Sequence, residues 1–333
     1  MKVHDLGEKK LIARLREKLK IDENEHFARF DDAFYFESIN RGNLVLNTDM
    51  LVGKTDIPKI MDYYQVGRKS VIMNVSDLIV KNIKPEGMVV SFGFPRNLEI
   101  ENFDKLIGGI LEISENYNIQ YLGGDINESD DLIVNITIFG FQEGNIISRH
   151  GIQEEDIVAV TGEFGFTTAG LFLILNKLHS EMEPKYEAVV NAVLQPQLNY
   201  DSILGISNQE GISASIDSSD GLSASLLDLM DVNDFGFEID NLPINPLIEE
   251  FSHDYDVSIE ELLFYGGEEY HALFIIGKDY WQAIKDFSLE NNFYLEKIGH
   301  VISEKNLVYE NKMKKIRKII TKRGFEHFNP FQA

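Results

Sequence analysis

The sequence predicts a two-domain protein of the α/β (α+β) class, and three observations support this prediction. The chain has 333 residues, enough for a large core and for more than one domain. Segments with strand-like alternation and segments with helical periodicity are mixed in both halves. A candidate domain boundary falls between Gly144 and Gly151. We therefore expect an N-terminal domain over residues 1–148 and a C-terminal domain over residues 149–333.

The composition excludes several classes of function. The formal net charge of −24 argues against general nucleic-acid binding, because a phosphate backbone would be repelled. The chain has no cysteine, so disulfides, thiolate nucleophiles and Cys-ligated metal sites are ruled out. Residues 1–20 form a charged amphipathic segment, which resembles neither a signal peptide nor a membrane span. We expect a cytoplasmic protein with no membrane partner.

In the N-terminal half, an apolar run that ends near residue 39 and a second run over 44–50 predict a hairpin around the turn Asn40-Arg41-Gly42. The next helix carries Ser76-Asp77 within an apolar stretch. A short strand is expected to end at Gly123-Gly124-Asp125, where glycines would let backbone amides approach a phosphate. The elements expected after the hairpin are a helix over 66–82, a strand over 87–94, a helix over 100–117 and strands over 119–122 and 132–141.

In the C-terminal half, strands are again separated by helical runs. The expected strands cover 157–160, 212–216, 235–239 and 271–276, and the expected helices cover 167–178, 186–194 and 222–230. A basic segment over 311–323 is most simply a solvated face that pairs with the acidic remainder of the protein. Electrostatic steering of an anionic substrate is the alternative interpretation of this segment.

One junction between a strand and a helix carries two aspartates, Asp217 and Asp220. Gly221 gives the backbone room to turn closely, and Ser219 or Asp220 is expected to cap the helix that follows. Because a cap needs only one oxygen, the second carboxylate is available for a bound cation and its phosphate. A capped turn without any ligand is the alternative.

Further aspartates lie at the ends of predicted elements or in apolar surroundings. They are Asp31, Asp32, Asp49, Asp77 and Asp125, and they add to Asp217 and Asp220. Burying so many unpaired negative charges would be very costly, so cations must offset them. Magnesium is the natural candidate, because it prefers carboxylate, water and phosphate oxygens. Magnesium held between carboxylates and a polyphosphate is typical of phosphoryl transfer.

In this order, the motifs resemble the thiamine-monophosphate kinase family, within the aminoimidazole-ribonucleotide-synthetase-like ATP-binding superfamily. The resemblance runs nearly from end to end of the chain. The motifs are Gly7-Glu8, Asp31-Asp32-Ala33, Thr48-Asp49-Met50-Leu51-Val52, Gly67-Arg68-Lys69, Ser76-Asp77-Leu78, Gly123-Gly124-Asp125, Arg149 with Gly151, Val160-Thr161-Gly162, Asp217 with Ser219-Asp220-Gly221-Leu222, Gly266-Gly267-Glu268, and Gly324-Phe325-Glu326-His327-Phe328.

The resemblance implies a homodimer whose N-terminal mixed sheets form a shared barrel, with ATP as co-substrate and thiamine monophosphate as acceptor in clefts between the domains. The implied reaction is direct in-line transfer of the γ-phosphate, which gives thiamine diphosphate. Several magnesium ions would be held by Asp31, Asn47, Thr48, Asp49, Asp77, Asp125, Asp217 and Asp220, and potassium is a further candidate ion. Gly124, Asp125, Arg149 and Ser219 would contact ATP, while Asp56, Glu268 and Phe325 would face the acceptor.

The sequence departs from the family pattern at two of these acceptor-side positions. Asp56 stands where the family commonly has histidine, and Phe325 takes the place of tyrosine or tryptophan. Two alternatives therefore accompany the kinase prediction. One is another ATP-dependent enzyme of the superfamily, such as an aminoimidazole ribonucleotide synthetase, although Ile126 stands where that enzyme usually has threonine. The other is a catalytically silent nucleotide-binding protein.

Overall fold

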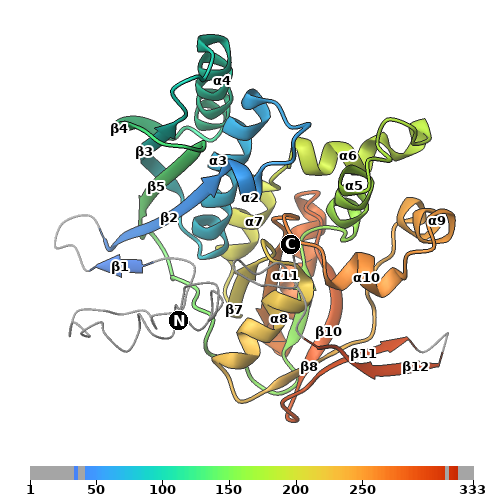
Figure 1. Ribbon diagram of the computed structural model, residues 1–333. Coiled ribbons are helices and arrows are strands. Elements are labelled where there is room, and N and C mark those ends of the chain that lie inside the picture. The colour runs from blue at the N-terminus through green and yellow to red at the C-terminus, as the bar shows by residue number, and fades with distance from the viewer. Residues whose placement is uncertain (1–33, 37–41, 312–314, 322–333) are drawn as a thin grey trace, which may run out of the picture.

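Two mixed β-sheets organise the protein, which a computed structural model describes over residues 34–36, 42–311 and 315–321 (Figure 1). The expected helix near the start of the chain lies outside these residues, as do Asp31, Asp32 and Phe325. Among the described residues, no helix combines the length and apolar character needed to cross a bilayer.

The N-terminal half forms a five-stranded sheet in the order β1-β2-β5-β3-β4. The antiparallel pairing expected of the hairpin is confirmed, because Phe34 lies opposite Leu46, while Asn40 and Arg41 of its turn lie outside the described residues. The last two strands in this order pair in parallel, because helix α4 (Ile100–Asn116) connects them. The strands are β1 (Phe34–Phe36), β2 (Leu44–Val52), β3 (Pro85–Phe94), β4 (Gln120–Glu128) and β5 (Ile133–Phe141).

Helices α3 (Tyr63–Val80) and α4 pack together on one side of this sheet, and the short helix α2 (Gly53–Asp56) follows β2 (Figure 1). α3 begins three residues before the start expected from periodicity, because Asp62 and Gln65 form a capping box. The Asp62 carboxylate accepts from the Gln65 amide at 2.8 Å, and the Gln65 side chain accepts from the Asp62 amide at 2.9 Å. This cap fixes where the helix enters the core.

The two faces of the five-stranded sheet differ in burial. The face toward α3 carries alternate buried residues of each strand, such as Val45 on β2, Ile136 on β5 and Val90 on β3. The opposite face carries exposed side chains, including Met50 and Val89. Among the described residues, no helix covers this outer face (Figure 1).

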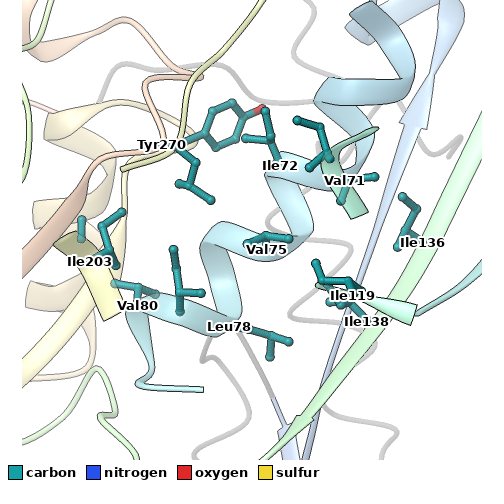
Figure 2. Close-up of a cluster of buried hydrophobic side chains, with 14 of the residues drawn as sticks. Val71, Ile72, Val75, Leu78, Val80, Ile119, Ile136, Ile138, Ile203 and Tyr270 are labelled. Atoms are coloured by element: carbon teal, nitrogen blue, oxygen red, sulfur yellow. The ribbon is translucent and has the colours of Figure 1, made fainter. Parts of the chain in front are cut away.

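Helix α3 lies at the centre of the molecule and is buried on most of its surface. Figure 2 shows Val75 on this helix, with Ile136 of the N-terminal sheet on one side and Ile203 and Tyr270 of the C-terminal half on the other. All of these side chains belong to one buried cluster. The two halves of the chain therefore share a hydrophobic core that is built around one helix.

The C-terminal half forms a seven-stranded sheet in the order β12-β11-β8-β10-β6-β9-β7. Most neighbouring strands are antiparallel, but β11 and β8 pair in parallel. The strands are β6 (Ile157–Val160), β7 (Ile212–Asp217), β8 (Gly236–Ile239), β9 (Ala272–Ile276), β10 (Glu296–Ile302), β11 (Leu307–Asn311) and β12 (Ile316–Ile319). On β12, Arg317 pairs with Glu238 at 3.1 Å and Lys318 pairs with Glu260 at 3.2 Å. These ion pairs agree with the prediction that the basic segment pairs with acidic residues of the same protein.

Helices α5 and α8 follow the ends of β6 and β7, as the sequence predicts. The sequence does not predict helices α7 and α9, because each has too few residues to show a clear helical repeat of apolar side chains. The helical segments of this half are α5 (Phe166–Leu175), η2 (Pro184–Tyr186), α6 (Glu187–Leu194), α7 (Tyr200–Ser207), α8 (Leu222–Asp231), α9 (Pro246–Asp254), α10 (Ile259–Phe264), η3 (Lys278–Tyr280) and α11 (Trp281–Glu290).

Two local details differ from the prediction. Gly123-Gly124-Asp125 does not end a strand but lies in the middle of β4. The N-cap position of α8 is Gly221, one residue beyond the Ser219 and Asp220 expected there. Gly221 has φ +102°, and a Cβ atom there would lie 2.7 Å from the Gly266 carbonyl oxygen. The close approach of two loops therefore sets this turn.

Candidate active site at the junction of the two halves

Two hydrogen bonds between β2 and α3 position two of the predicted acidic residues, Asp49 and Asp77. The Asn74 side chain accepts a hydrogen bond from the Asp49 amide at 3.0 Å. The Asn47 amide donates to the Asp77 carboxylate. Asn47 and Asp49 share the inner face of β2, because side chains alternate along a strand. The strand and the helix therefore hold Asn47, Asp49 and Asp77 together.

The end of β7 brings a third aspartate to the same helix. Asp217 is only 3% exposed, and its carboxylate accepts from the Ser76 hydroxyl of α3 at 2.5 Å. Its other oxygen accepts from the Ser219 hydroxyl at 3.3 Å. The loop after β7 is tied to the loop before β9, because the amides of Glu268 and Tyr270 donate to the carbonyls of Ser219 and Ser218.

The buried phenol of Tyr270 shows that these acids share one electrostatic environment. Burial raises the pKa of Tyr270 well above its usual value, and the charges of Glu268, Asp217, Asp49 and Asp77 raise it further. The four carboxylates come from β2, α3, the end of β7 and the loop before β9. The junction of the two halves is thus a concentrated negative site.

Lys69 is a functional candidate that the sequence offers only as part of the motif Gly67-Arg68-Lys69, without a role. Its side chain is 2% exposed, and its ammonium group donates to the Glu268 carboxylate at 2.5 Å and to the Asp56 carbonyl at 2.9 Å. The Asp56 carboxylate itself accepts from the Val52 amide at 2.7 Å. Lys69 therefore connects Asp56 and Glu268, the two described residues that are predicted to face the acceptor. Its place two residues before the apolar run that begins at Val71 is a weak signal, because charged residues there are usually solvated.

Other predicted site residues lie apart from this group. Thr48 points to the outer face of the sheet, where its hydroxyl donates to the Ile136 carbonyl at 3.0 Å. Asp125 on β4 is exposed and pairs with Ser91 of β3. At about 4.8 Å per strand, the register places Asp125 about 14 Å from β2. A polyphosphate chain would have to span this separation for both strands to contact one nucleotide.

The remaining nucleotide-side residues lie on connecting segments. Ser219 and Asp220 are exposed on the loop after β7. Arg149 lies in the segment between the halves, and its carbonyl accepts from the Asn233 side chain at 2.8 Å. Gly124 has φ +152°, and a Cβ atom there would lie 1.7 Å from the Val90 carbonyl oxygen, so only glycine fits this approach of β4 to β3.

The donor set matches the chemistry of magnesium. All the predicted ligands offer oxygen atoms, which this ion prefers. The Ser218 hydroxyl beside Asp217 is buried without a hydrogen-bond partner. In the described part of the chain, no three His, Cys, Asp or Glu side chains form a ready metal cluster. The hydrogen bonds from Asn47 and Ser76 instead occupy carboxylate oxygens, and these bonds would have to exchange when an ion binds.

A pocket of about 540 Å³ lies next to this acidic junction in the C-terminal half. It is formed by the loop after β6, the start of α5, one side of α6 and the loop before β9. Glu268 contributes to its wall and also binds Lys69, so it stands between the pocket and the junction. The pocket size suits a small organic ligand.

Comparisons with known proteins agree with this architecture. Residues 30–142 match the N-terminal domain of AIR synthase related proteins, and residues 153–310 match the C-terminal domain. The chain is 32% identical over 286 residues to a thiamine-monophosphate kinase of Nitrosopumilus maritimus, covering 86% of this chain and 89% of that protein. It is 27% identical over 330 residues to that of Aquifex aeolicus, covering 98% and 100%.

Among solved structures, AaThiL complexed with AMPPCP and TMP superposes with a TM-score of 0.85 at 26% identity, covering 98% of this chain and 99% of that one. The two mixed sheets and the acidic junction between them define an enzyme of the AIR synthase related class. Within that class, the chain belongs to the thiamine-monophosphate kinase family.

Proposed function

We propose that this protein phosphorylates thiamine monophosphate to thiamine diphosphate, with ATP as the phosphate donor. The observation that carries the proposal is the group of four carboxylates around Tyr270, in a chain of this family. Such a group repels a bare polyphosphate and therefore favours one that arrives with divalent cations. A relative of the same fold binds AMPPCP, an ATP analogue, together with TMP, which supports both substrates.

The proposed roles are those that the family resemblance implies. Magnesium would lower the repulsion between the two phosphates and polarise the transferred group. The proposed metal ligands are Asp31, Asn47, Thr48, Asp49, Asp77, Asp125, Asp217 and Asp220, the proposed ATP contacts are Gly124, Asp125, Arg149 and Ser219, and the proposed acceptor contacts are Asp56, Glu268 and Phe325. Potassium remains a further candidate ion.

The contribution of the chain itself is positioning. Ser76 and Ser219 orient the Asp217 carboxylate, and Lys69 orients Glu268. A phosphate monoester is already an anionic nucleophile near neutral pH, so no general base is needed. Direct in-line attack then depends on the alignment of the two phosphates by these groups.

We also propose a homodimer in which the outer faces of two five-stranded sheets close a shared barrel. The outer face exposes apolar side chains that include Met50 at 54%, Val89 at 41% and Leu122 at 55%. An apolar sheet face of this kind favours contact with a partner surface. The same proposal divides the chain into domains 1–148 and 149–333. A cytoplasmic location stays a prediction of the sequence.

The proposal is tested with purified protein, ATP, magnesium and thiamine monophosphate. We expect ADP and thiamine diphosphate in equal amounts, and inversion of configuration at a γ-phosphorus made chiral with oxygen isotopes. Retention would indicate a phosphorylated enzyme intermediate and contradict direct transfer. ADP formed only with another acceptor would keep the superfamily but reject this substrate. Nucleotide binding without turnover would favour a silent protein.

A further inference from the structure

The loop between α10 and β9 directs Tyr270 away from the pocket and toward helix α3. Its two neighbours in the chain, Glu269 and His271, line the pocket, whereas Tyr270 does not. Figure 2 shows the Tyr270 ring beside α3, with its hydroxyl oxygen pointing toward the helix. This tyrosine therefore belongs to the acidic junction and not to the pocket wall.

Two contacts of α3 fix the groups on either side of Tyr270. The ammonium of Lys69 donates to the Glu268 carboxylate. Further along the same face of the helix, the Ser76 hydroxyl donates to the Asp217 carboxylate at 2.5 Å. Tyr270 packs against the turns between these two positions. The phenol therefore stands between a proposed acceptor contact and a proposed metal ligand, which is where the two reacting phosphates would meet.

The Tyr270 hydroxyl lacks a hydrogen-bond partner among the described residues, although only 3% of this residue is exposed. It is not one of the fully sealed polar atoms either, so the small exposed surface of the residue includes this oxygen. Tyr186, a tyrosine of similar burial, donates to the Asp254 carboxylate at 2.7 Å. Buried tyrosines usually have such a partner. A nearly buried hydroxyl without one, beside four carboxylates, indicates a position for an acceptor atom that arrives with a ligand.

The backbone holds this phenol in place at a conformational cost. Glu268 and Tyr270 have φ +67° and +51°, a left-handed conformation that residues other than glycine rarely adopt. Their amides donate to the carbonyls of Ser219 and Ser218 at 2.6 and 3.1 Å, which ties the loop to the end of β7. Strain of this kind persists where the surrounding contacts impose it, and it is common at functional sites. The loop thus fixes the direction of the ring relative to Asp217.

A neutral hydrogen-bond donor has a distinct use among these acids. The carboxylates of Glu268, Asp217, Asp49 and Asp77 repel the oxygens of a phosphoryl group. Burial and these charges raise the pKa of the Tyr270 phenol well above its usual value, so the hydroxyl keeps its proton near pH 7. It can donate one hydrogen bond to an oxygen that gains negative charge, and a donor fixed in advance needs no reorganisation.

We propose that the Tyr270 hydroxyl is a catalytic hydrogen-bond donor to an oxygen of the phosphoryl group in transfer. The proposal rests on the proposed function, and it adds a neutral donor at the point where the two phosphates meet. The hydroxyl keeps its proton throughout, so no bond to Tyr270 forms or breaks. The contact strengthens as the phosphoryl group leaves ATP, so it contributes to kcat more than to either KM.

Tyr270→Phe in the full chain removes the hydroxyl and keeps the ring. We expect kcat to fall by about 10- to 100-fold, as for the loss of one hydrogen bond to a charged group, with both KM values within about twofold of the original. The melting temperature should stay the same, because the hydroxyl has no partner among the described residues. Tyr186→Phe is the matched control. It removes the hydroxyl that binds Asp254, so it should lower the melting temperature and leave kcat unchanged.

A binding measurement tests whether the contact is made to the transferred group. ADP with aluminium fluoride and magnesium mimics a phosphoryl group in transfer, whereas AMPPCP mimics ATP before transfer. Tyr270→Phe should weaken binding of the first by about tenfold or more and leave the second unchanged. Unchanged kcat, or equal losses for the two ligands, would overturn the proposal even if thiamine monophosphate is phosphorylated. If it is not phosphorylated, the proposed function fails, while a selective loss of aluminium fluoride binding would still support the contact.

Discussion

At Asp217, two hydroxyl groups from different parts of the chain hold a nearly buried carboxylate. Ser76 comes from α3 and Ser219 from the loop after β7, so the orientation of this acid depends on the docking of the two halves. Hydrogen bonds of this kind stabilise the charged form and offset part of the desolvation cost. The remaining charge repulsion with Asp49, Asp77 and Glu268 favours cation binding.

The first prediction concerns Asp77→Asn. We expect turnover to fall by about 100-fold or more, because the neutral amide no longer contributes charge at the proposed metal site. Thermal stability should change little or rise, since the substitution relieves repulsion among the acids around Tyr270. Steady-state rates and thermal melts measure both effects. The control is Asp104→Asn on the exposed side of α4, and near-normal turnover of Asp77→Asn would remove this residue from the site.

The second prediction concerns pH and Glu269. Burial raises the pKa of Glu269 from 4.5 to about 7, so the folded protein keeps a proton that the unfolded chain has lost. This contribution to stability is complete below pH 4.5 and disappears as the pH rises to about 7. Replacing Glu269 with Gln, whose oxygen can still accept from the Gly165 and Thr167 amides, should therefore stabilise the protein at pH 8 relative to pH 5 by about 1 to 3 kcal/mol.

Urea unfolding of both proteins at pH 5 and pH 8 measures this difference. The groups near Glu269 are His271, Glu163 and Glu268, and His271 acts in the opposite direction. Burial lowers the pKa of His271 from 6.5 to about 4, so its contribution is lost as the pH falls through that range. Comparison with Glu269→Gln at each pH cancels the His271 contribution. An identical pH profile in both proteins would contradict the prediction.

Among the elements, α3 was predictable as a helix, but its role was not. Its apolar run and Asp62 cap are local signals. The contacts of Ser76 with Asp217 and of Lys69 with Glu268 join residues 141 and 199 positions apart. No periodicity in the sequence encodes such distances, so the sequence indicated the aspartates but not their orientation or the buried lysine.

Strand β4 shows why one local interpretation failed. The apolar run over 119–122 stops before Gly123-Gly124, so the sequence predicts a strand end there, with backbone amides open to a phosphate. In the structure these glycines lie within an edge strand, just after a register shift between Met88 and Val89 of β3. Glycine there permits a close approach between two strands, a tertiary cause that the sequence does not show.

The third prediction concerns the end of α3, where the C-terminal half supplies hydrogen-bond donors. The Ser215 hydroxyl donates to the Val80 carbonyl at 2.6 Å. The Ser207 hydroxyl lies 3.0 Å from the Ile79 carbonyl and 2.7 Å from the Ile203 carbonyl of its own helix, and the Ile79 carbonyl also accepts from the Asn82 amide at 3.0 Å. Carbonyls of the last helical turn lack some of their partners within the helix. We expect Ser215→Ala to lower the free energy of unfolding by about 1 to 2 kcal/mol, and Ser207→Ala to lower it by less, because the Ile79 carbonyl keeps an amide donor.

Chemical denaturation measures these losses, and Ser114→Ala provides a matched control. Ser114 is also buried, but its hydroxyl donates to the Ile110 carbonyl within α4, which the helical amide of Ser114 also contacts. Its removal should cost less than about 0.5 kcal/mol, because alanine favours the helix. Equal losses at all three positions would show that the serines do not act through the docking of the two halves.

For the whole molecule, the shared core makes the two halves one structural unit. The cluster around α3 contains side chains from the five-stranded sheet and from α7, β9 and α11. The sequence predicted two domains from composition and pattern, which matches the two sheets. It could not predict that one helix would be buried between them. Because α3 is buried on most sides, its faces differ little in polarity, and the sequence pattern does not indicate which face packs where.

The fourth prediction concerns assembly. Each chain carries a formal net charge of −24, so two copies repel each other, and salt screens that repulsion. If the apolar outer face of the five-stranded sheet joins two copies, dimerisation should strengthen as NaCl rises from about 0.05 to about 0.5 M. Val89→Asp on that face should shift the protein to monomer, whereas Leu289→Asp, at a more exposed apolar site on α11, should not. Sedimentation velocity measures the populations. A monomer at every salt concentration, or dissociation by Leu289→Asp alone, would exclude this face as the interface.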